Sequence, residues 1–137
     1  MRFTVDIEPI GKARPRFTKT GHAYTLQKTK DAEELIAAAY RAAGGGCIPK
    51  GVPIGLEVTA YFPIPKSYSQ KKRDDAMSRN ILPTKKPDAD NILKLAADAL
   101  NGVAYEDDAQ VVRMEVCKEY TALDGGYMEI TIFGGET

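Results

Sequence analysis

The amino-acid sequence predicts a single α+β domain in which helices pack on one face of a mixed β-sheet. Apolar residues alternate with polar ones in four separate stretches, and they recur at helical spacing in two others. The chain has 137 residues, of which 43% are hydrophobic and 28% are charged, as is typical of one globular domain. We therefore expect one domain over residues 1–137, with its elements in the order β-α-β-α-β-β.

The first part of the chain contains one expected strand, a loop and one helix. Phe3, Val5 and Ile7 alternate with polar residues, and Pro9 ends that strand. Residues 11–28 have no apolar period and are expected to form a long basic loop. A helix is expected over residues 31–43, with acids in its first turn, Arg41 in its last turn and three glycines after it. Its apolar face would comprise Leu35, Ile36, Ala39, Tyr40 and Ala43.

The second part contains a strand, a helix and two further strands. Alternation over residues 54–62 predicts the strand. Residues 66–86 form a second basic stretch whose KKRDDAMSR core is compatible with a short helix, but we expect it to be mobile because it has few apolar anchors. The helix is expected from about Asp90 to Leu100, with Gly102 closing it. Its buried face would comprise Ile92, Leu93, Ala96, Ala97 and Leu100. Residues 112–116 and 128–132 alternate as strands, and residues 124–126 predict a hairpin-type turn between them.

The formal net charge is zero, but the charges are segregated along the chain. Residues 11–30 carry six cations and no acid, and residues 66–86 carry seven cations against two acids. Residues 88–108 carry six acids against Lys94 alone. The resulting net charges of +6, +5 and −5 cancel in the sum but not in space. The basic segments could therefore grip a polyanion while a metal ion offsets the acidic segment.

The acidic segment contains the residue types that hold divalent metals in phosphodiester hydrolysis. Asp88 and Asp90 stand two apart before the expected helix, so an extended approach would point both carboxylates to one side. Asp90 and Lys94 share a helix face, and Asp98 lies one turn further along it. Residues 106–108 are all acidic and follow the helix after a short loop. Hard cations prefer such oxygen ligands, so these residues are candidates for a metal site.

Each of these residues also has a purely structural interpretation. Asp90 suits a helix N-cap, Asp88 is favoured by the helix dipole, and Lys94 would form an ordinary surface ion pair. Residues 106–108 would then form a solvated turn. A cap requires only one acid, however, and neighbouring carboxylates repel one another unless a cation offsets them. Spacing alone supports the structural and the metal-site interpretations about equally.

Two motifs in the same order resemble the RusA family of Holliday-junction resolvases, which are small and often phage-derived endodeoxyribonucleases. They are Asp88-x-Asp90-Asn91-x-x-Lys94 and Asp107-Asp108-Ala109-Gln110-Val111-Val112. The segment Gly11-Lys12-Ala13-Arg14-Pro15-Arg16, with Tyr24-Thr25 after it, resembles phage-type members. The resemblance covers most of the chain, and the acidic motifs are more specific than the basic segment.

The resemblance implies a metal-dependent endodeoxyribonuclease of recombination and repair. It implies a homodimer that binds a four-way DNA junction and cuts two strands symmetrically, using Mg²⁺, or Mn²⁺ in its place, and no small-molecule cofactor. Asp88, Asp90 and Asp108 would hold the metal, and Lys94 matches the family's essential lysine. Asp108 is the better match for the third acid, and Asp107 also fits it.

Cations from both basic segments are the expected DNA contacts. They are Lys12, Arg14, Arg16, Lys19, Lys71, Lys72, Arg73, Lys85 and Lys86. Phe17 and Tyr24 are candidate stacking groups for bases. The structural alternative for these residues is a solubilising surface.

Other classes of function compete with the nuclease. A non-catalytic module for branched DNA would use the acids only as caps and turn residues. A hydrolase of a small phosphate compound would need only one or two cationic contacts, and a structural interaction protein would leave the acids unexplained. The sequence has no signal-peptide core and no apolar run of 18 residues, so we expect a cytoplasmic protein without a membrane partner. Cys47 and Cys117 lack metal-type spacing and are expected to be free thiols.

Overall fold

The main sheet contains four strands, and neighbouring strands are ordered β1-β6-β4-β5. These strands are β1 (Arg2–Val5), β4 (Ile54–Pro63), β5 (Val111–Thr121) and β6 (Tyr127–Phe133). The computed structural model describes residues 1–12, 16–17, 23–24 and 27–134, with only the backbone at 16–17 and 23–24. The short strands β2 (Arg16–Phe17) and β3 (Ala23–Tyr24) form a separate antiparallel pair. The main sheet is mixed, as predicted, because β5 runs parallel to β4 while the other pairs are antiparallel.

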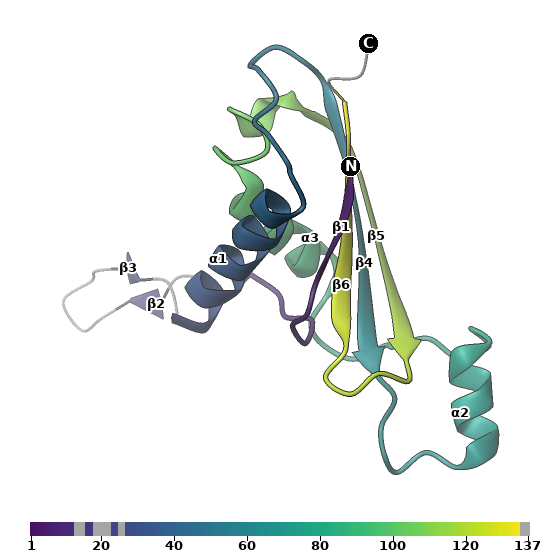
Figure 1. Cartoon of the computed structure of the whole chain (residues 1–137). Helices are drawn as coiled ribbons and strands as arrows, with labels where there is room; N and C mark the ends of the chain where they lie inside the picture. Colours follow the sequence, from purple (N-terminus) through teal and green to yellow (C-terminus); the bar gives the residue numbers. More distant parts are fainter. Residues whose placement is uncertain (13–15, 18–22, 25–26, 135–137) are drawn as a thin grey trace.

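Three α-helices accompany the sheet in the described part of the chain: α1 (Gln27–Ala42), α2 (Gln70–Met77) and α3 (Ala89–Leu100). Figure 1 shows α1 and α3 together on one face of the sheet, while α2 lies beyond the end at which β4 and β5 finish. A short 3₁₀ helix, η1 (Asp108–Gln110), precedes β5. The prediction of an α+β domain with helices on one sheet face is confirmed. No helix among the described residues is long and apolar enough to span a bilayer.

The core lies between the sheet and the two helices that cover it. Alternate residues of β4 are fully buried, as are Met128, Ile130 and Ile132 of the neighbouring strand β6. The helix α3 contributes Ile92, Leu95 and Leu100, none of which is exposed. Burial of each such side chain stabilises the fold by about 1.5–3 kcal/mol. This packing fixes the direction in which the opposite, charged side of α3 faces.

The first helix differs from its prediction at its N-terminal end. It begins at Gln27 rather than residue 31, and it has no acid in its first turn. Thr29 and Ala32 are buried, so the side of the helix that faces the sheet extends further toward the N-terminus than the apolar pattern indicated. The prediction that Leu35 is buried is wrong, because half of its surface (50%) is exposed.

The turn at residues 124–126 is not a hairpin, and that prediction is wrong. It connects β5 to β6, but β4 lies between these two strands in the sheet. The turn therefore passes over the C-terminal end of β4. Gly126 has φ +66°, and a Cβ built there would lie 2.3 Å from the carbonyl oxygen of Tyr61 in β4. Only glycine permits this close crossing without a shift of the backbone.

The short helix α2 is held mainly by polar contacts, which is consistent with its few apolar residues. Ser69 caps its first turn by accepting a hydrogen bond from the Lys72 amide, and Ala76 is its buried residue. The Arg73 guanidinium donates to backbone carbonyls of the preceding segment, including those of Lys66 and Tyr68 at 3.2 Å each. Arginine provides several such donors in a fixed plane, so one side chain secures the connection before α2.

We predict that replacing Gly126 by alanine destabilises the protein far more than replacing Gly125. Both glycines have positive φ angles, of +66° and +81°, so both variants incur the left-handed penalty of about 1–2 kcal/mol. Only Gly126→Ala also drives a methyl group into the Tyr61 carbonyl, since nothing lies within 4 Å of a Cβ at Gly125. Urea denaturation should show an additional loss of at least about 2 kcal/mol for Gly126→Ala. Equal losses would show that the turn does not cross β4 at this distance.

Candidate active site

The exposed side of α3 presents a row of charged side chains at helical spacing. Asp90, Lys94 and Asp98 follow one another at intervals of four residues, so they lie along one side of the helix. Asp88 is the N-cap residue, but its side chain makes no capping hydrogen bond. Asp90 lies within the first turn and is not the cap. Capping therefore does not account for the Asp88–Asp90 pair.

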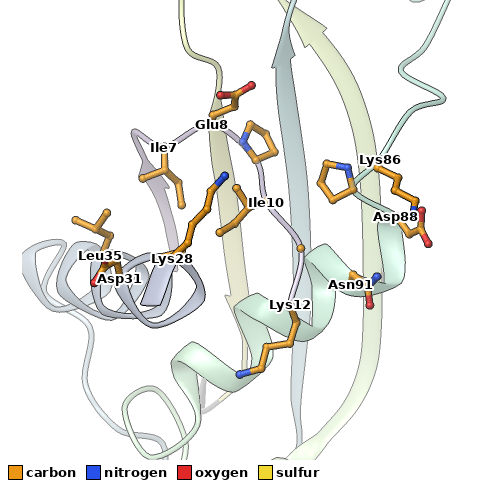
Figure 2. A pocket seen from close by; sticks show the side chains of 14 residues that line it. Ile7, Glu8, Ile10, Lys12, Lys28, Asp31, Leu35, Lys86, Asp88 and Asn91 are labelled. Carbon is orange, nitrogen blue, oxygen red and sulfur yellow. The ribbon is translucent and has the colours of Figure 1, made fainter. Parts of the chain in front are cut away.

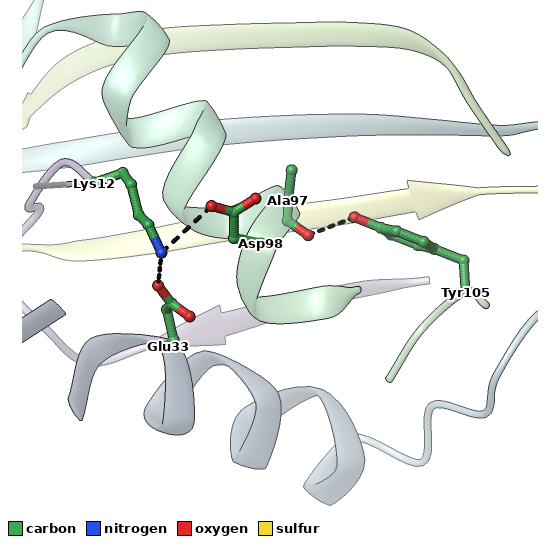
Figure 3. A network of polar contacts seen from close by, with 5 residues as sticks. All are labelled: Lys12, Glu33, Ala97, Asp98 and Tyr105. Carbon is green, nitrogen blue, oxygen red and sulfur yellow. Dashed lines mark hydrogen bonds and ion pairs between the residues drawn. The ribbon is translucent and has the colours of Figure 1, made fainter. Parts of the chain in front are cut away.

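The segment after α3 returns the chain to the same side of the helix. The Gly102 amide donates to the Tyr105 carbonyl at 2.8 Å, which closes a tight turn. The Tyr105 ring is fully buried, and its hydroxyl donates to the carbonyl oxygen of Ala97 at 2.6 Å (Figure 3). Burial raises the pKa of Tyr105, and the negative charges of Asp108 and Asp98 add to that effect. The hydroxyl therefore stays protonated and holds the turn against α3.

Asp107 and Asp108 have different roles in the acidic turn. The Asp107 carboxylate caps η1 by accepting a hydrogen bond from the Ala109 amide at 3.1 Å. Asp108 instead lines a cavity of about 410 Å³ between α3 and the start of β5. The cavity is also lined by Asp90, Leu93, Lys94, Ala97, Asp98, Val111 and Met114. The structure thus places three aspartates and one lysine from two separate segments around one space.

The carboxylates at this cavity repel one another. Partial burial raises the pKa of Asp108 above its usual value, and the negative charges of Asp98 and Asp107 raise it further. A carboxylate surrounded by like charges is destabilised in its ionised form. A cation in the cavity would relieve this repulsion, so the electrostatics favour cation binding.

Asp88 lies at a neighbouring cavity of about 670 Å³ rather than at the one lined by Asp90 and Asp108. Figure 2 shows Asp88 and Lys86 at one rim of this cavity, and Lys28 and Leu35 of α1 on its other side. The Asp88 side chain is exposed, and it has no capping bond that would fix its direction.

Lys12 connects the N-terminal segment to both covering helices (Figure 3). Its ammonium group forms ion pairs with Glu33 of α1 and with Asp98 of α3, the latter at 3.4 Å. Burial lowers the pKa of Lys12, but the two carboxylates outweigh burial and raise it above the usual value. The Lys12 amide also donates to the Asn91 carbonyl at 2.9 Å, beside Gly11, where a Cβ would lie only 2.8 Å from Asn91 Cβ. A phosphate could reach this ammonium only by competing with both acids.

The other expected DNA contacts fall into three groups. Lys71, Lys72, Lys85 and Lys86 are exposed, and Lys72 also lies 4.2 Å over the ring of Tyr68. Arg73 is engaged with backbone carbonyls, as described above. Arg14 and Lys19 lie outside the described residues, as do the side chains of Arg16, Phe17 and Tyr24.

The acids of the cavity lined by Asp90, Asp98 and Asp108 offer carboxylate oxygens, which are the ligands that hard divalent cations prefer. Within the described ranges, however, no three acidic, histidine or cysteine side chains are close enough together to hold a metal as they stand. A metal held by three of these acids would therefore require movement of side chains, and the Asp88 and Asp90 side chains are both exposed.

Asp98 lines the candidate site, although the family motif did not select it. It lies at the cavity with Asp90 and Asp108, raises the pKa of Asp108 and pairs with Lys12. Its spacing of four residues from Lys94 placed it on the correct side of the helix. The pairing with Lys12 joins residues 86 positions apart, and no local pattern indicates such a contact.

Separated acids and one lysine around a cavity beside a sheet edge are typical of an enzyme that cleaves phosphodiesters with metal. The sequence matches the family described as Endodeoxyribonuclease RusA over residues 6–132. The chain therefore belongs to the RusA family, whose members are endodeoxyribonucleases that act on branched junction DNA. It is also similar to YqaN of Bacillus subtilis (strain 168), a protein described as uncharacterized, with 37% identity over 126 residues and 88% of each chain covered.

We predict that Asp108→Asn does not destabilise the protein and raises its melting temperature near neutral pH. Folding raises the pKa of Asp108, so the wild-type protein loses stability as the pH rises through that pKa, whereas the amide does not ionise. The gain should be roughly 1 °C, because the group is largely exposed and screened. The gain should disappear at about pH 3, where the Asp108 carboxyl is mostly protonated in both the folded and the unfolded wild-type protein.

Asp124→Asn is the matched control for this measurement. It removes one carboxylate from the turn at the opposite end of β5, away from the cavity. A lower melting temperature for Asp108→Asn at neutral pH, with no such loss for Asp124→Asn, would contradict the repulsion at the cavity.

Proposed function

We propose that this protein is a Mg²⁺-dependent endodeoxyribonuclease that resolves four-way DNA junctions by paired, symmetric cleavage. The observation that carries the proposal is the shared cavity of Asp90, Lys94 and Asp108, which come from both family motifs. RusA resolvases are generally metal-dependent, and the repulsion around Asp108 supports a cation there.

Asp88, Asp90 and Asp108 would hold the metal, with Mn²⁺ able to replace Mg²⁺. Asp88 would turn from the rim of the neighbouring cavity toward Asp90, which its exposed position permits. The bound cation supplies Lewis-acid activation of the phosphodiester and of an attacking water. The water would lose a proton to solvent and attack phosphorus in line, and the bond to the 3′ oxygen would break, with that oxygen taking up a proton from solvent.

Lys94 would stabilise the negative charge that develops on the phosphate oxygens. It lies between Asp90 and Asp98 on the same side of α3 and lines the same cavity. Lys94 is an exposed residue, so it can meet a phosphate that approaches from solvent. Asp98, held by Lys12, would keep the local charge negative enough to favour the cation.

Paired cleavage would require two copies of the site. The described chain has one cavity with this set of side chains, and a junction offers two equivalent strands related by a two-fold axis. A homodimer with the same symmetry would place one site at each strand.

We predict that the protein linearises a supercoiled plasmid carrying a cruciform, and cuts a labelled four-way junction, when Mg²⁺ is present. Asp90→Asn should lower the cleavage rate by more than about 1000-fold, because it removes a metal ligand, while junction affinity stays within about twofold. EDTA should abolish cleavage, and linear duplex DNA should remain intact. Product analysis on gels and a band-shift assay measure both properties.

The outcomes of this experiment separate the parts of the proposal. Cleavage by Asp90→Asn at the wild-type rate would remove the site assignment. Nicked circles without linear product would contradict paired cutting by a dimer.

The alternative is a non-catalytic module for branched DNA. One observation favours it: no three acids among the described residues are grouped closely enough to hold a metal. Such a module would bind the junction equally well with Mg²⁺ or EDTA and would never cut it.

We predict that Lys71 and Lys86 contribute phosphate contacts that are sensitive to salt. Each contact releases counterions, so log K falls with log salt by about 0.9 per phosphate. Combining Lys71→Gln with Lys86→Gln should therefore reduce the magnitude of the slope by about 2. Arg2→Gln is the control, since Arg2 is exposed on β1 on the sheet face away from the helices. An unchanged slope in the double variant would assign these lysines to a solvated surface.

A further inference from the structure

Gln110 is a buried polar residue at the junction of η1 and β5, and only 5% of its surface is exposed. Its side-chain amide uses both of its ends. The oxygen Oε1 accepts hydrogen bonds from the backbone amides of Glu106 and Asp107, each at 2.9 Å. The nitrogen Nε2 donates to the carbonyl oxygens of Pro49 at 2.8 Å and Val52 at 3.1 Å, with that of Ile48 at 3.4 Å.

These bonds connect two loops that are distant in the sequence. The acidic turn at residues 106–108 is joined to the loop at residues 48–52, which precedes β4. The Lys50 amide also donates to the Glu106 carboxylate at 2.7 Å, which is a further bond between the two loops. The Ile48 amide donates to the carbonyl of Ala104, just before the acidic turn, at 2.8 Å. The acidic turn is therefore fastened to the fold at Gln110 rather than free in solvent.

The attachment determines the roles of the two aspartates. With its amide bound by Gln110, Asp107 is the N-cap of η1, and its carboxylate is used by the Ala109 amide. The following residue, Asp108, then faces the cavity with Asp90 and Lys94. A turn released from Gln110 would lose the capping arrangement that separates these two roles.

We propose that Gln110 is a positioning residue that directs Asp108, rather than Asp107, into the metal-binding cavity; this rests on the proposed function. Only a side chain with an acceptor and a donor on one plane satisfies both sets of partners. An ionised glutamate keeps the acceptor but turns a second anionic oxygen toward the three carbonyls. Methionine fills a similar volume and makes none of the five bonds.

The test measures Mn²⁺ affinity of the DNA-free protein by electron paramagnetic resonance, for the wild type, Gln110→Glu and Gln110→Met. At about pH 8, both variants should bind Mn²⁺ at least about tenfold more weakly than the wild type. As the pH falls to about 5.5, Gln110→Glu should approach the wild-type affinity measured at that pH, because a protonated carboxyl regains one donor. Gln110→Met should show the same deficit at every pH.

Ile130→Val is the control for lost stability. Ile130 is fully buried in β6 and lies in the sheet rather than in either loop, so its truncation should lower the melting temperature without changing Mn²⁺ affinity. Methionine at position 110 introduces no charge, so that variant remains informative if Gln110→Glu does not fold at high pH. Wild-type Mn²⁺ affinity in folded Gln110→Met would overturn the inference.

Amide hydrogen exchange separates this inference from the proposed function. The Glu106 and Asp107 amides should be protected in the wild type and should exchange at least about tenfold faster in Gln110→Met. If they exchange freely in the wild type, Gln110 does not position the turn. If they are protected but the wild type neither binds Mn²⁺ nor cuts junctions, the nuclease proposal fails and with it the metal role of Asp108.

Discussion

Burial of one side of α3 is the constraint on which the candidate site depends. Ile92, Leu95 and Leu100 are completely removed from solvent, and each contributes about 1.5–3 kcal/mol to stability. Interactions between neighbouring exposed charges on a helix, such as Asp90 with Lys94, amount to only a few tenths of a kcal/mol per pair. Packing of the apolar residues therefore decides how α3 is rotated about its axis. The side that carries Asp90, Lys94 and Asp98 consequently faces away from the core. The fold thereby holds acids closer together than they would lie in an unfolded chain.

The path of the chain through the sheet brings the second acidic segment to the same place. Because β5 runs parallel to β4, the chain must return along the sheet before β5 begins, and α3 makes that return. The start of β5 consequently lies beside the exposed side of α3. Tyr105 secures this return by its buried hydroxyl bond to α3. The same topology sends the turn after β5 across the end of β4, which explains the requirement for Gly126.

Residues of the same type have different roles because their neighbours differ. Asp107 caps a short helix while Asp108 faces the cavity. Among the cations, Lys12 is bound by two acids and Arg73 by backbone carbonyls, whereas Lys71 is exposed. A count of charges in each segment treats these residues as equivalent, so it overstates the number of cations available for DNA among the residues whose side chains are described.

The sequence by itself determined the class of fold, most strand positions, the helix α3 and the spacing of the charged residues along it, because apolar periodicity and residue spacing are local properties. It did not determine which strands are neighbours, and it wrongly indicated a hairpin at residues 124–126. Nor could it show that Asp88 lies at a different cavity from Asp90, or that Lys12 is paired with Asp98. Those features depend on contacts between segments far apart in the chain, and only packing of the helices on the sheet decides which distant segments meet.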